Sequence, residues 1–340
     1  MTRARTPPMR LSPPPARQPR QHPHPPRRAA RRRQRGAALL VAMVVLSVVA
    51  TLAAGMVWQQ WKAVQVETAE RSRAQSAWIL TGALDWARLI LREDARSGRA
   101  TSLNEPWATP LAEARLSTFL AADRDNTADS GPEAFLAGSI TDAQARYNLR
   151  NLVADGKVVP AQRAVLQRLC ASAGLDAATG NLVADGLQAA MVGEASAPLL
   201  PQQLTDLAWL GLDAASIERL TTVAVLLPVA TPVNLNTASR EVLAGVVPGL
   251  DLGGADRLVQ ARVRQPFRTL AEAGQVLGAA VPLEGGAVDV KSAYFEVRGR
   301  LRLADRVLEE QTLVERQADL RVVAIQRQRV AGLSLAQAPR

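Results

Sequence analysis

The sequence predicts an α+β fold in which one long N-terminal helix packs on an antiparallel sheet that carries a large all-α insertion. Three observations predict it. An uncharged run over 36–61 continues into an amphipathic helical pattern, and residues 294–303 alternate between apolar and charged side chains as a half-buried strand does. Most of the segment from Pro160 to Gly278 has helical periodicity, with abundant Ala and Leu between Gly and Pro breakers.

The positive charge of the chain is concentrated before the apolar run. The whole sequence has 41 Lys and Arg against 31 Asp and Glu, a net charge of +10. Residues 1–36 hold 11 of the arginines and no acidic residue, so the remaining 30 basic and 31 acidic residues nearly cancel. This leader is rich in Pro, Arg and Gln and lacks aromatic residues, so we predict that it is disordered. Translation starts at either Met1 or Met9.

The residues after the leader contain no histidine, because His22 and His24 both precede Gly36. Catalytic and zinc sites that depend on imidazole are therefore excluded for the body of the protein. The single cysteine, Cys170, excludes an internal disulfide, and its place in a helical run predicts a buried, unreactive thiol rather than a reactive or intermolecular one. We predict a protein that is not an enzyme and holds no cofactor.

The run over 36–61 is long enough to cross a bilayer. As a helix its 26 residues span about 39 Å, which exceeds the ~30 Å hydrocarbon core. Because arginines precede the run and none follows it directly, the positive-inside rule places the leader in the cytoplasm and the chain from Lys62 onward across the membrane. Trp58 and Trp61 then lie at the far interface.

A secretory signal peptide explains this segment poorly. The apolar run is longer than a signal peptide core, it does not end in an A-x-A cleavage site, and the helical pattern continues after it to about Ser97. Gly98 follows a last turn that contains Arg96, and this pattern is typical of a helix end. In the second half of the helix, apolar residues recur at spacings of three and four and predict its packing face: Ala77, Leu80, Leu84, Ala87 and Leu91.

The domain beyond the helix is predicted in three parts. Residues 99–159 form an α/β part with a turn candidate at Thr141–Asp142, and residues 160–280 form the helical insertion. Residues 281–327 form antiparallel strands, in which the clear alternation over 294–303 is followed by weaker runs at 307–315 and 320–327. Residues 328–340 are expected to be a tail.

A basic leader that ends in Gly36, followed by a spanning helix that becomes amphipathic, resembles the type IV pilins and their type II secretion relatives, the pseudopilins. The resemblance implies that prepilin peptidase cuts between Gly36 and Ala37 and methylates the new amine; an uncut anchor with an incidental glycine is the alternative. The fifth residue after this cut is Val41, where most of the family has a glutamate thought to pair with a neighbour's N-terminal amine. A subunit at the end of a filament lacks one neighbour, so it can do without that costly carboxylate.

Three stretches resemble the general secretion pathway protein K family of minor pseudopilins, which lacks this glutamate and carries a large helical insertion. They are ITDAQARYNLRNLV at 140–153, PLLPQQLTDLAWLGLDAASIERL at 198–220 and TPVNLNTASREVLAGVVPGL at 231–250. The resemblance implies a single-pass inner-membrane protein with a periplasmic main domain. It also implies a place at the pseudopilus tip, a role in initiating assembly for protein export, and other minor pseudopilins as partners. The apolar helix face over 77–91 would pack partly on the protein's own sheet and partly against neighbouring helices.

A membrane-anchored periplasmic DNA-binding protein is the alternative function, because residues 233–274 also resemble a helix-hairpin-helix element. In that interpretation Thr237 caps the first helix. Asp251 replaces the second glycine of the hairpin, however, and places a negative side chain where a phosphate would approach. The net charge of residues 231–280 is only +1, from five arginines and four acidic residues, so we expect no nucleic-acid partner.

Calcium is a weak candidate ligand, because related pseudopilins bind it and an acidic stretch offers carboxylates. The candidate ligands are Asp123, Asp125, Asp129 and Glu133. Their spacing lacks the sharp-turn glycine and the register of an EF-hand loop, so a solvated loop is the favoured interpretation.

Overall fold

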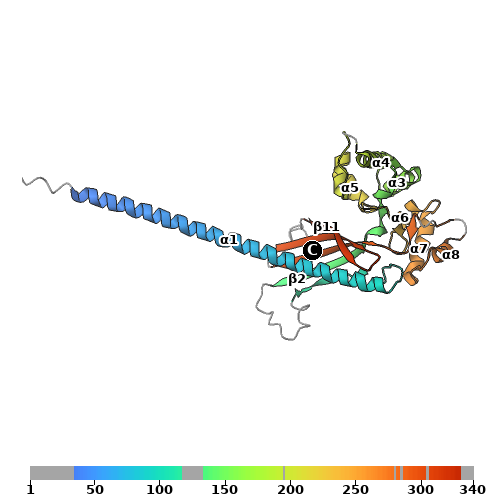
Figure 1. The fold of residues 1–340 in the computed structure, drawn as a ribbon, viewed down its shortest axis with the longest axis horizontal. Helices are drawn as coiled ribbons and strands as arrows, with labels where there is room; N and C mark the ends of the chain where they lie inside the picture. The colour runs from blue at the N-terminus through green and yellow to red at the C-terminus, as the bar shows by residue number, and fades with distance from the viewer. Residues whose placement is uncertain are drawn as a thin grey trace, which may run out of the picture. The chain divides into compact units, whose positions relative to one another are not determined.

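The structure is a computed structural model that describes residues 34–116, 133–193, 196–278, 281–283, 286–303 and 306–330. The chain divides into two compact units, residues up to Ala69 and residues from Glu70 onward. Helix α1, Gln34–Arg96, contributes to both (Figure 1). It confirms the predicted long helix, and Gly98, at φ 64°, lies just beyond its end.

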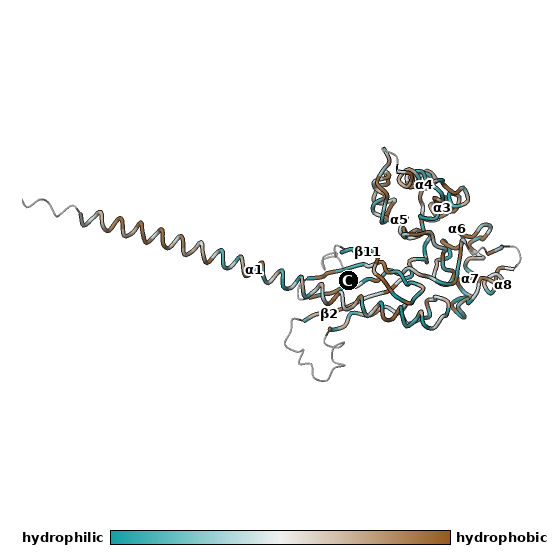
Figure 2. The backbone as a smooth tube through the Cα atoms, in the orientation of Figure 1, coloured by the Kyte–Doolittle hydropathy of each residue, from teal (hydrophilic) through white to brown (hydrophobic). Residues whose placement is uncertain are grey.

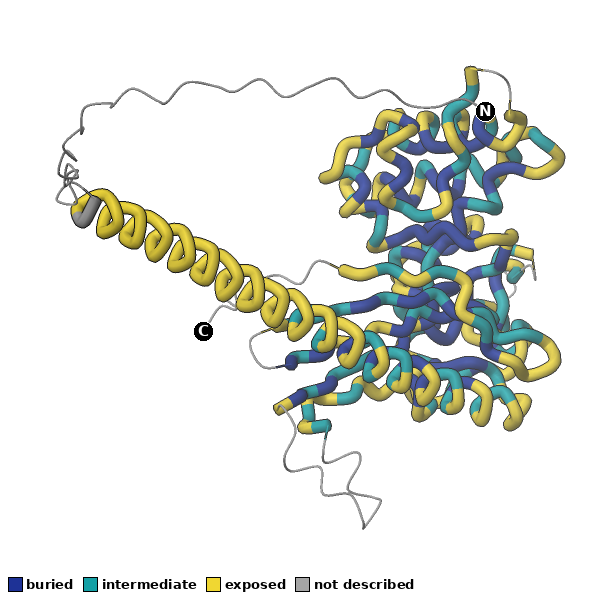
Figure 3. Tube along the Cα trace, turned by 60° about the vertical axis from the view of Figure 1, so that its left-hand side comes forward, coloured by how far each residue is buried: buried dark blue, intermediate teal, exposed yellow. Residues whose placement is uncertain are grey.

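The first unit contains the apolar part of α1. Every described side chain from Gly36 to Thr68 is exposed (Figure 3), and Figure 2 shows that this part is largely hydrophobic. Within the described residues, α1 contains the one helix segment that is long and apolar enough to span a membrane. Exposed apolar surface of this extent would be unfavourable in water, so the segment is suited to lipid or to other helices.

The second unit is built on a five-stranded sheet. Its strands are β1 Leu111–Arg115, β2 Ala134–Asp142, β9 Tyr294–Leu303, β10 Arg306–Arg316 and β11 Val322–Val330. Their order is β1-β2-β9-β10-β11, and every neighbouring pair is antiparallel. The antiparallel meander predicted at the C-terminal end is confirmed by the pairs β9–β10 and β10–β11, and Leu301 and Leu303 of β9 are buried as the alternation predicted.

The second half of α1 packs on one face of this sheet. Leu84, Ala87 and Leu91 lie in one cluster with Phe295 and Val297, and the side chain of Leu91 is completely buried. Leu80 lies in a second cluster with apolar residues of β2 and β9. The short 3₁₀ helix η1, Pro106–Ala108, adds Trp107, whose ring meets that of Phe295 edge to face at 5.2 Å between centroids.

The insertion occupies the sequence between two strands that are neighbours in the sheet. The chain leaves β2 at Asp142 and returns at the start of β9, Tyr294, so the inserted segment is 143–293. Its α-helices are α3 Pro160–Ser172, α4 Ala177–Val192, α5 Ala214–Leu220, α6 Arg240–Val246, α7 Leu252–Arg264 and α8 Leu270–Leu277. Its 3₁₀ helices are η3 Ala143–Ala145, η4 Leu149–Leu152 and η5 Leu204–Leu210.

Helical periodicity placed the insertion at 160–280, and the structure extends it at both ends. The added residues take part in three short strand pairs, two of which they form with residues inside 160–280, and helical periodicity does not reveal these pairs. They are β3 Tyr147–Asn148 with β6 Ala224–Val225, β4 Val153–Ala154 with β5 Lys157–Val158, and β7 Val233–Asn234 with β8 Val288–Asp289. The insertion is therefore mainly helical, and two of these pairs, β3 with β6 and β7 with β8, join segments that are distant in sequence.

The insertion has its own hydrophobic core. Leu166, Leu169 and Cys170 of α3 are fully buried in it. Burial raises the pKa of the Cys170 thiol to about 11, as expected for an unreactive cysteine. Helices α3 and α6 approach so closely that a Cβ at Gly245 would clash with the side chain of Leu169. A larger residue at this position would therefore force the buried Leu169 to move.

Candidate functional site

The expected processing site, Gly36 and Ala37, lies in the first turn of α1, and both residues are exposed. Apart from its chain neighbours and the adjacent helix backbone, no atom of a described residue lies within 4 Å of the position that a Cβ on Gly36 would occupy. Glycine costs about 1 kcal/mol relative to alanine in a helix, and nothing in the described fold requires it at this position. A requirement for glycine at Gly36 would therefore come from another molecule.

The apolar face of the same segment includes Val41, which is exposed and uncharged. At the polar end of the run, Trp58 and Trp61 stack with 5.4 Å between ring centroids. The Lys62 ammonium nitrogen lies 5.6 Å from the centroid of Trp58. This cluster of two indoles and a cation is typical of the point where a membrane-spanning segment meets the interface.

The predicted packing face over 77–91 lies mostly inside the protein. Leu80, Leu84, Ala87 and Leu91 are buried against the sheet, and Ala77 is half-buried. These side chains hold α1 on its own domain. The large apolar side chains that this part of α1 leaves exposed are others: Trp78, Trp86 and Leu89. The face available to neighbouring helices is thus different from the face that periodicity selected.

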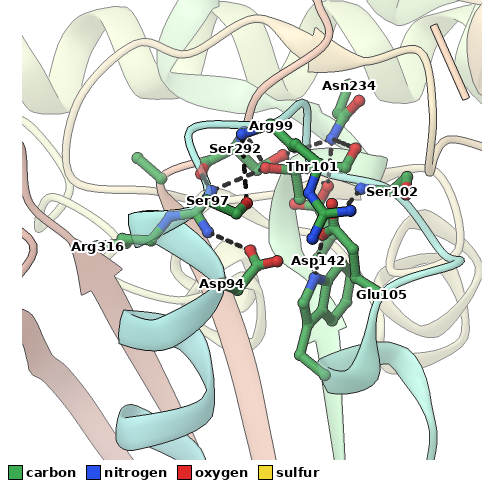
Figure 4. A network of polar contacts seen from close by, with 12 residues as sticks. Asp94, Ser97, Arg99, Thr101, Ser102, Glu105, Asp142, Asn234, Ser292 and Arg316 are labelled. Carbon is green, nitrogen blue, oxygen red and sulfur yellow. Dashed lines mark hydrogen bonds and ion pairs between the residues drawn. The ribbon is translucent and has the colours of Figure 1, made fainter. Parts of the chain in front are cut away.

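A buried polar cluster joins the end of β2 to the insertion (Figure 4). One carboxylate oxygen of Asp142 accepts hydrogen bonds from the hydroxyl groups of Thr237 and Ser292, both at 2.6 Å, and from the Asn234 amide at 3.0 Å. The other oxygen accepts from the backbone N–H of Gln144 at 2.8 Å. Burial raises the pKa of Asp142, although these hydrogen bonds act in the opposite direction.

The same cluster reaches the end of α1 through Arg316, the last residue of β10. Its guanidinium is paired with Asp94 at 2.7 Å and donates to the Thr101 hydroxyl and the Ser292 carbonyl, both at 2.8 Å (Figure 4). The side chains of Arg316 and Asp94 are both 10% exposed. Nearby, Glu105 accepts from the Trp107 indole N–H at 2.6 Å, and burial raises the pKa of its carboxyl.

This cluster is the residue set that sequence reasoning missed. Asp142 was predicted only as part of a turn, and Thr237 was predicted as a helix cap. The cap prediction is wrong: Ser239 caps α6 by accepting from the Val242 N–H at 3.3 Å, while Thr237 is buried and donates to Asp142. The signal that was available is that Asp142 and Thr237 come from two of the three stretches that carry the family resemblance.

In the hairpin between α6 and α7, the N-terminus of α7 is already capped by a side chain of this chain. The Asp251 carboxylate accepts from the Gly254 N–H at 2.7 Å, at the position where a phosphate would have to bind. Arg262 of α7 is buried and donates to the Leu235 carbonyl at 2.6 Å, and Arg240 is paired with Glu241. These contacts favour a structural use of the hairpin over DNA binding.

The calcium candidates Asp123, Asp125 and Asp129 lie outside the described residues. Glu133 is described, and it forms an ion pair with Arg115 at 2.6 Å. Over the ranges that the structure describes, no group of three or more His, Cys, Asp or Glu residues could hold a metal ion.

Comparison with known proteins gives matches to one family. The family described as type II secretion system (T2SS), protein K, matches residues 233–295, from β7 to the start of β9. The type II secretion system protein K of Pseudomonas aeruginosa is 29% identical over 296 residues, which cover 77% of this chain and 83% of that relative. The chain is thus similar to the type II secretion system protein K family, both in the segment 233–295 and over most of its length.

A solved structure has a similar fold. The crystal structure of the GspK-GspI-GspJ complex from the enterotoxigenic Escherichia coli type 2 secretion system contains a chain that matches with a TM-score of 0.58 at 17% identity. The match covers 78% of this chain and 99% of that one. It confirms the predicted α+β architecture of a long helix, an antiparallel sheet and a helical insertion.

Proposed function

We propose that this protein is a minor pseudopilin of the protein K family that is cut between Gly36 and Ala37 and then placed at the tip of a pseudopilus. The observation that carries the proposal is the continuity of α1, whose exposed apolar first half and sheet-packed second half form one helix. Such a helix suits a subunit that is held in the inner membrane as a precursor and later joins a stack of similar helices. The leader would then be cytoplasmic and the domain from Glu70 onward periplasmic.

The proposed place at the tip is supported by Val41 and by the insertion. A valine at this position cannot form the ion pair with a neighbour's N-terminal amine, so the subunit does not need a neighbour on that side. Residues 143–293 add a second core beside the sheet, and this bulk would be difficult to place in the middle of a filament. In this position the protein would initiate assembly and support protein export.

The proposed partners are two other minor pseudopilins, equivalent to the GspI and GspJ that accompany GspK in the matching crystal structure. Prepilin peptidase would act on the chain before assembly. Co-expression of the full chain with these two pseudopilins should yield a ternary complex in detergent. Failure of all three proteins to co-purify, with each one folded, would contradict this assignment.

The processing step can be tested with two matched glycine variants. Gly36→Leu and Gly55→Leu both place a leucine where the described fold leaves open space. If Gly36 is the recognition residue, co-expression with prepilin peptidase should leave only Gly36→Leu uncut and unable to support secretion. Normal cleavage of Gly36→Leu would show that the processing site lies elsewhere.

A further inference from the structure

Strand β11, Val322–Val330, is the longer of the two outer edges of the sheet. Among the described strands its one neighbour is β10, whereas the opposite edge is the five-residue β1 with an irregular register. Main-chain N–H and C=O groups on the outer side of an edge strand can pair with a strand from another molecule. The edge of β11 is therefore able to accept an extended segment.

A hollow of about 810 Å³ lies beside the first residues of this edge. The last turns of α1 form one wall, and the β10–β11 turn with the start of β11 forms the other. The Arg88 side chain fixes the two walls together by donating to the Val322 carbonyl at 2.7 Å. The hollow lies entirely within the unit that begins at Glu70.

The hollow contains exposed apolar side chains as well as charge. Leu89 is 43% exposed and Leu320 is 37% exposed, and they come from opposite walls. Leu320 has φ 67°, a left-handed conformation that costs a residue with a Cβ about 1 to 2 kcal/mol. The turn therefore keeps an exposed apolar side chain in a strained backbone conformation. Residues with strained backbones cluster at binding sites.

The charge of the hollow is positive. Its lining includes four arginines, Arg88, Arg92, Arg96 and Arg321, against two aspartates, Asp85 and Asp319. The aspartates pair with Arg88 and Arg321, and Arg96 pairs with Glu93 just outside the hollow. Arg92 is exposed and forms no ion pair with a described residue, and the same holds for Arg329 near the other end of β11.

These charges argue against a second copy of the chain as the occupant. Two β11 edges placed together would bring the exposed Arg329 of both copies close to one another, and a bulge opposite Leu313 and Val314 twists the edge. Exposed arginines and bulges are features that prevent edge strands from pairing with themselves. An acidic strand would meet opposite charge instead.

We propose that the edge of β11 binds an extended acidic segment of a partner protein, with alternating carboxylate and apolar side chains. The segment adds to the sheet as a further strand. Its carboxylates pair with Arg92 and Arg329, and an apolar side chain fills the space between Leu89 and Leu320. This site lies beyond the proposed function, because it requires neither cleavage at Gly36 nor the tip position.

The test uses the full chain in detergent and two fluorescein-labelled synthetic nonapeptides, one alternating Glu with Val and one alternating Lys with Val. Fluorescence anisotropy should show binding of the Glu peptide only. The double variant Arg92→Glu/Arg329→Glu should weaken that binding by about tenfold, because two opposite-charge contacts become repulsive. Arg264→Glu, at an exposed arginine of α7, is the matched control and should change the affinity less than about twofold.

Hydrogen exchange identifies the binding mode. The bound Glu peptide should slow amide exchange over 322–330 and leave exchange over β1 unchanged. The proposal is overturned if the Lys peptide binds equally well, if the double variant binds as the wild type does, or if β11 gains no protection. It is also overturned if phosphatidylglycerol vesicles, and not the Glu peptide, bind in a manner that depends on Arg92 and Arg329, since the basic surface would then serve a lipid.

Discussion

At the scale of single residues, the buried carboxyl of Asp142 joins the sheet to the insertion. Its four hydrogen-bond donors all come from the insertion, so the loss of this one side chain removes a hydrogen bond from each of four buried groups. Because the pKa of Asp142 is raised, the folded state holds the proton more tightly than the unfolded chain does. The contribution of this group to stability is therefore greatest at low pH.

This raised pKa predicts a pH dependence. The free energy of unfolding of the full chain should decline as pH rises from the ordinary aspartate value of 3.8 through the raised pKa of Asp142, and it should level off above that pKa. The variant Asp142→Asn does not titrate, so this part of the decline should disappear. Urea denaturation in detergent at a series of pH values measures the difference, and equal slopes in both proteins would contradict the assignment.

The Arg316–Asp94 pair predicts a large cost for a single substitution. Arg316→Ala leaves a nearly buried carboxylate without its cation and should lower the free energy of unfolding by about 3 to 5 kcal/mol. Arg321→Ala removes an exposed pair with Asp319 and should cost less than about 1 kcal/mol. Chemical denaturation of the two variants compares them directly, and similar losses would show that the buried pair has no special role.

At the scale of elements, α1 and β9 could be predicted because their patterns are local. A long uncharged run followed by apolar residues at spacings of three and four determines a helix, and strict alternation determines a half-buried strand. The pairing of β2 with β9 has no local signal, since Ala134 and Leu303 meet only after the insertion has folded back. For the same reason the insertion's ends at 143 and 293 were not predictable from helical periodicity.

The packing of α1 on its own sheet predicts a contrast between two neighbouring leucines. Leu91→Ala removes a fully buried side chain from the cluster with Phe295 and should cost about 2 to 5 kcal/mol in unfolding free energy. Leu89→Ala changes an exposed position and should cost much less. Thermal unfolding of both variants is the measurement. If Leu89→Ala were the more destabilising change, the helix would face the sheet differently.

At the scale of the whole molecule, the similarity to type II secretion system protein K and the buried hairpin contacts favour assembly over DNA binding. The candidate site could be predicted only in part, because Gly36 and Val41 belong to a sequence pattern whereas the Asp142 cluster depends on tertiary contacts.

The hairpin between α6 and α7 has no free site for a phosphate, because Asp251 already caps α7 and Arg262 is used inside the fold. A gel shift with the full chain at low salt should therefore show no salt-sensitive DNA binding, and such binding would restore the alternative function.

The central claim is that the chain is cut at the polar edge of its apolar helix before it assembles. N-terminal sequencing and intact mass measurement of the membrane-bound protein, isolated from cells that contain prepilin peptidase, test this claim most directly. We predict a protein that begins at Ala37, with a methylated amine, and lacks residues 1–36. A secretion-competent protein that still begins at Met1 or Met9 would contradict the claim.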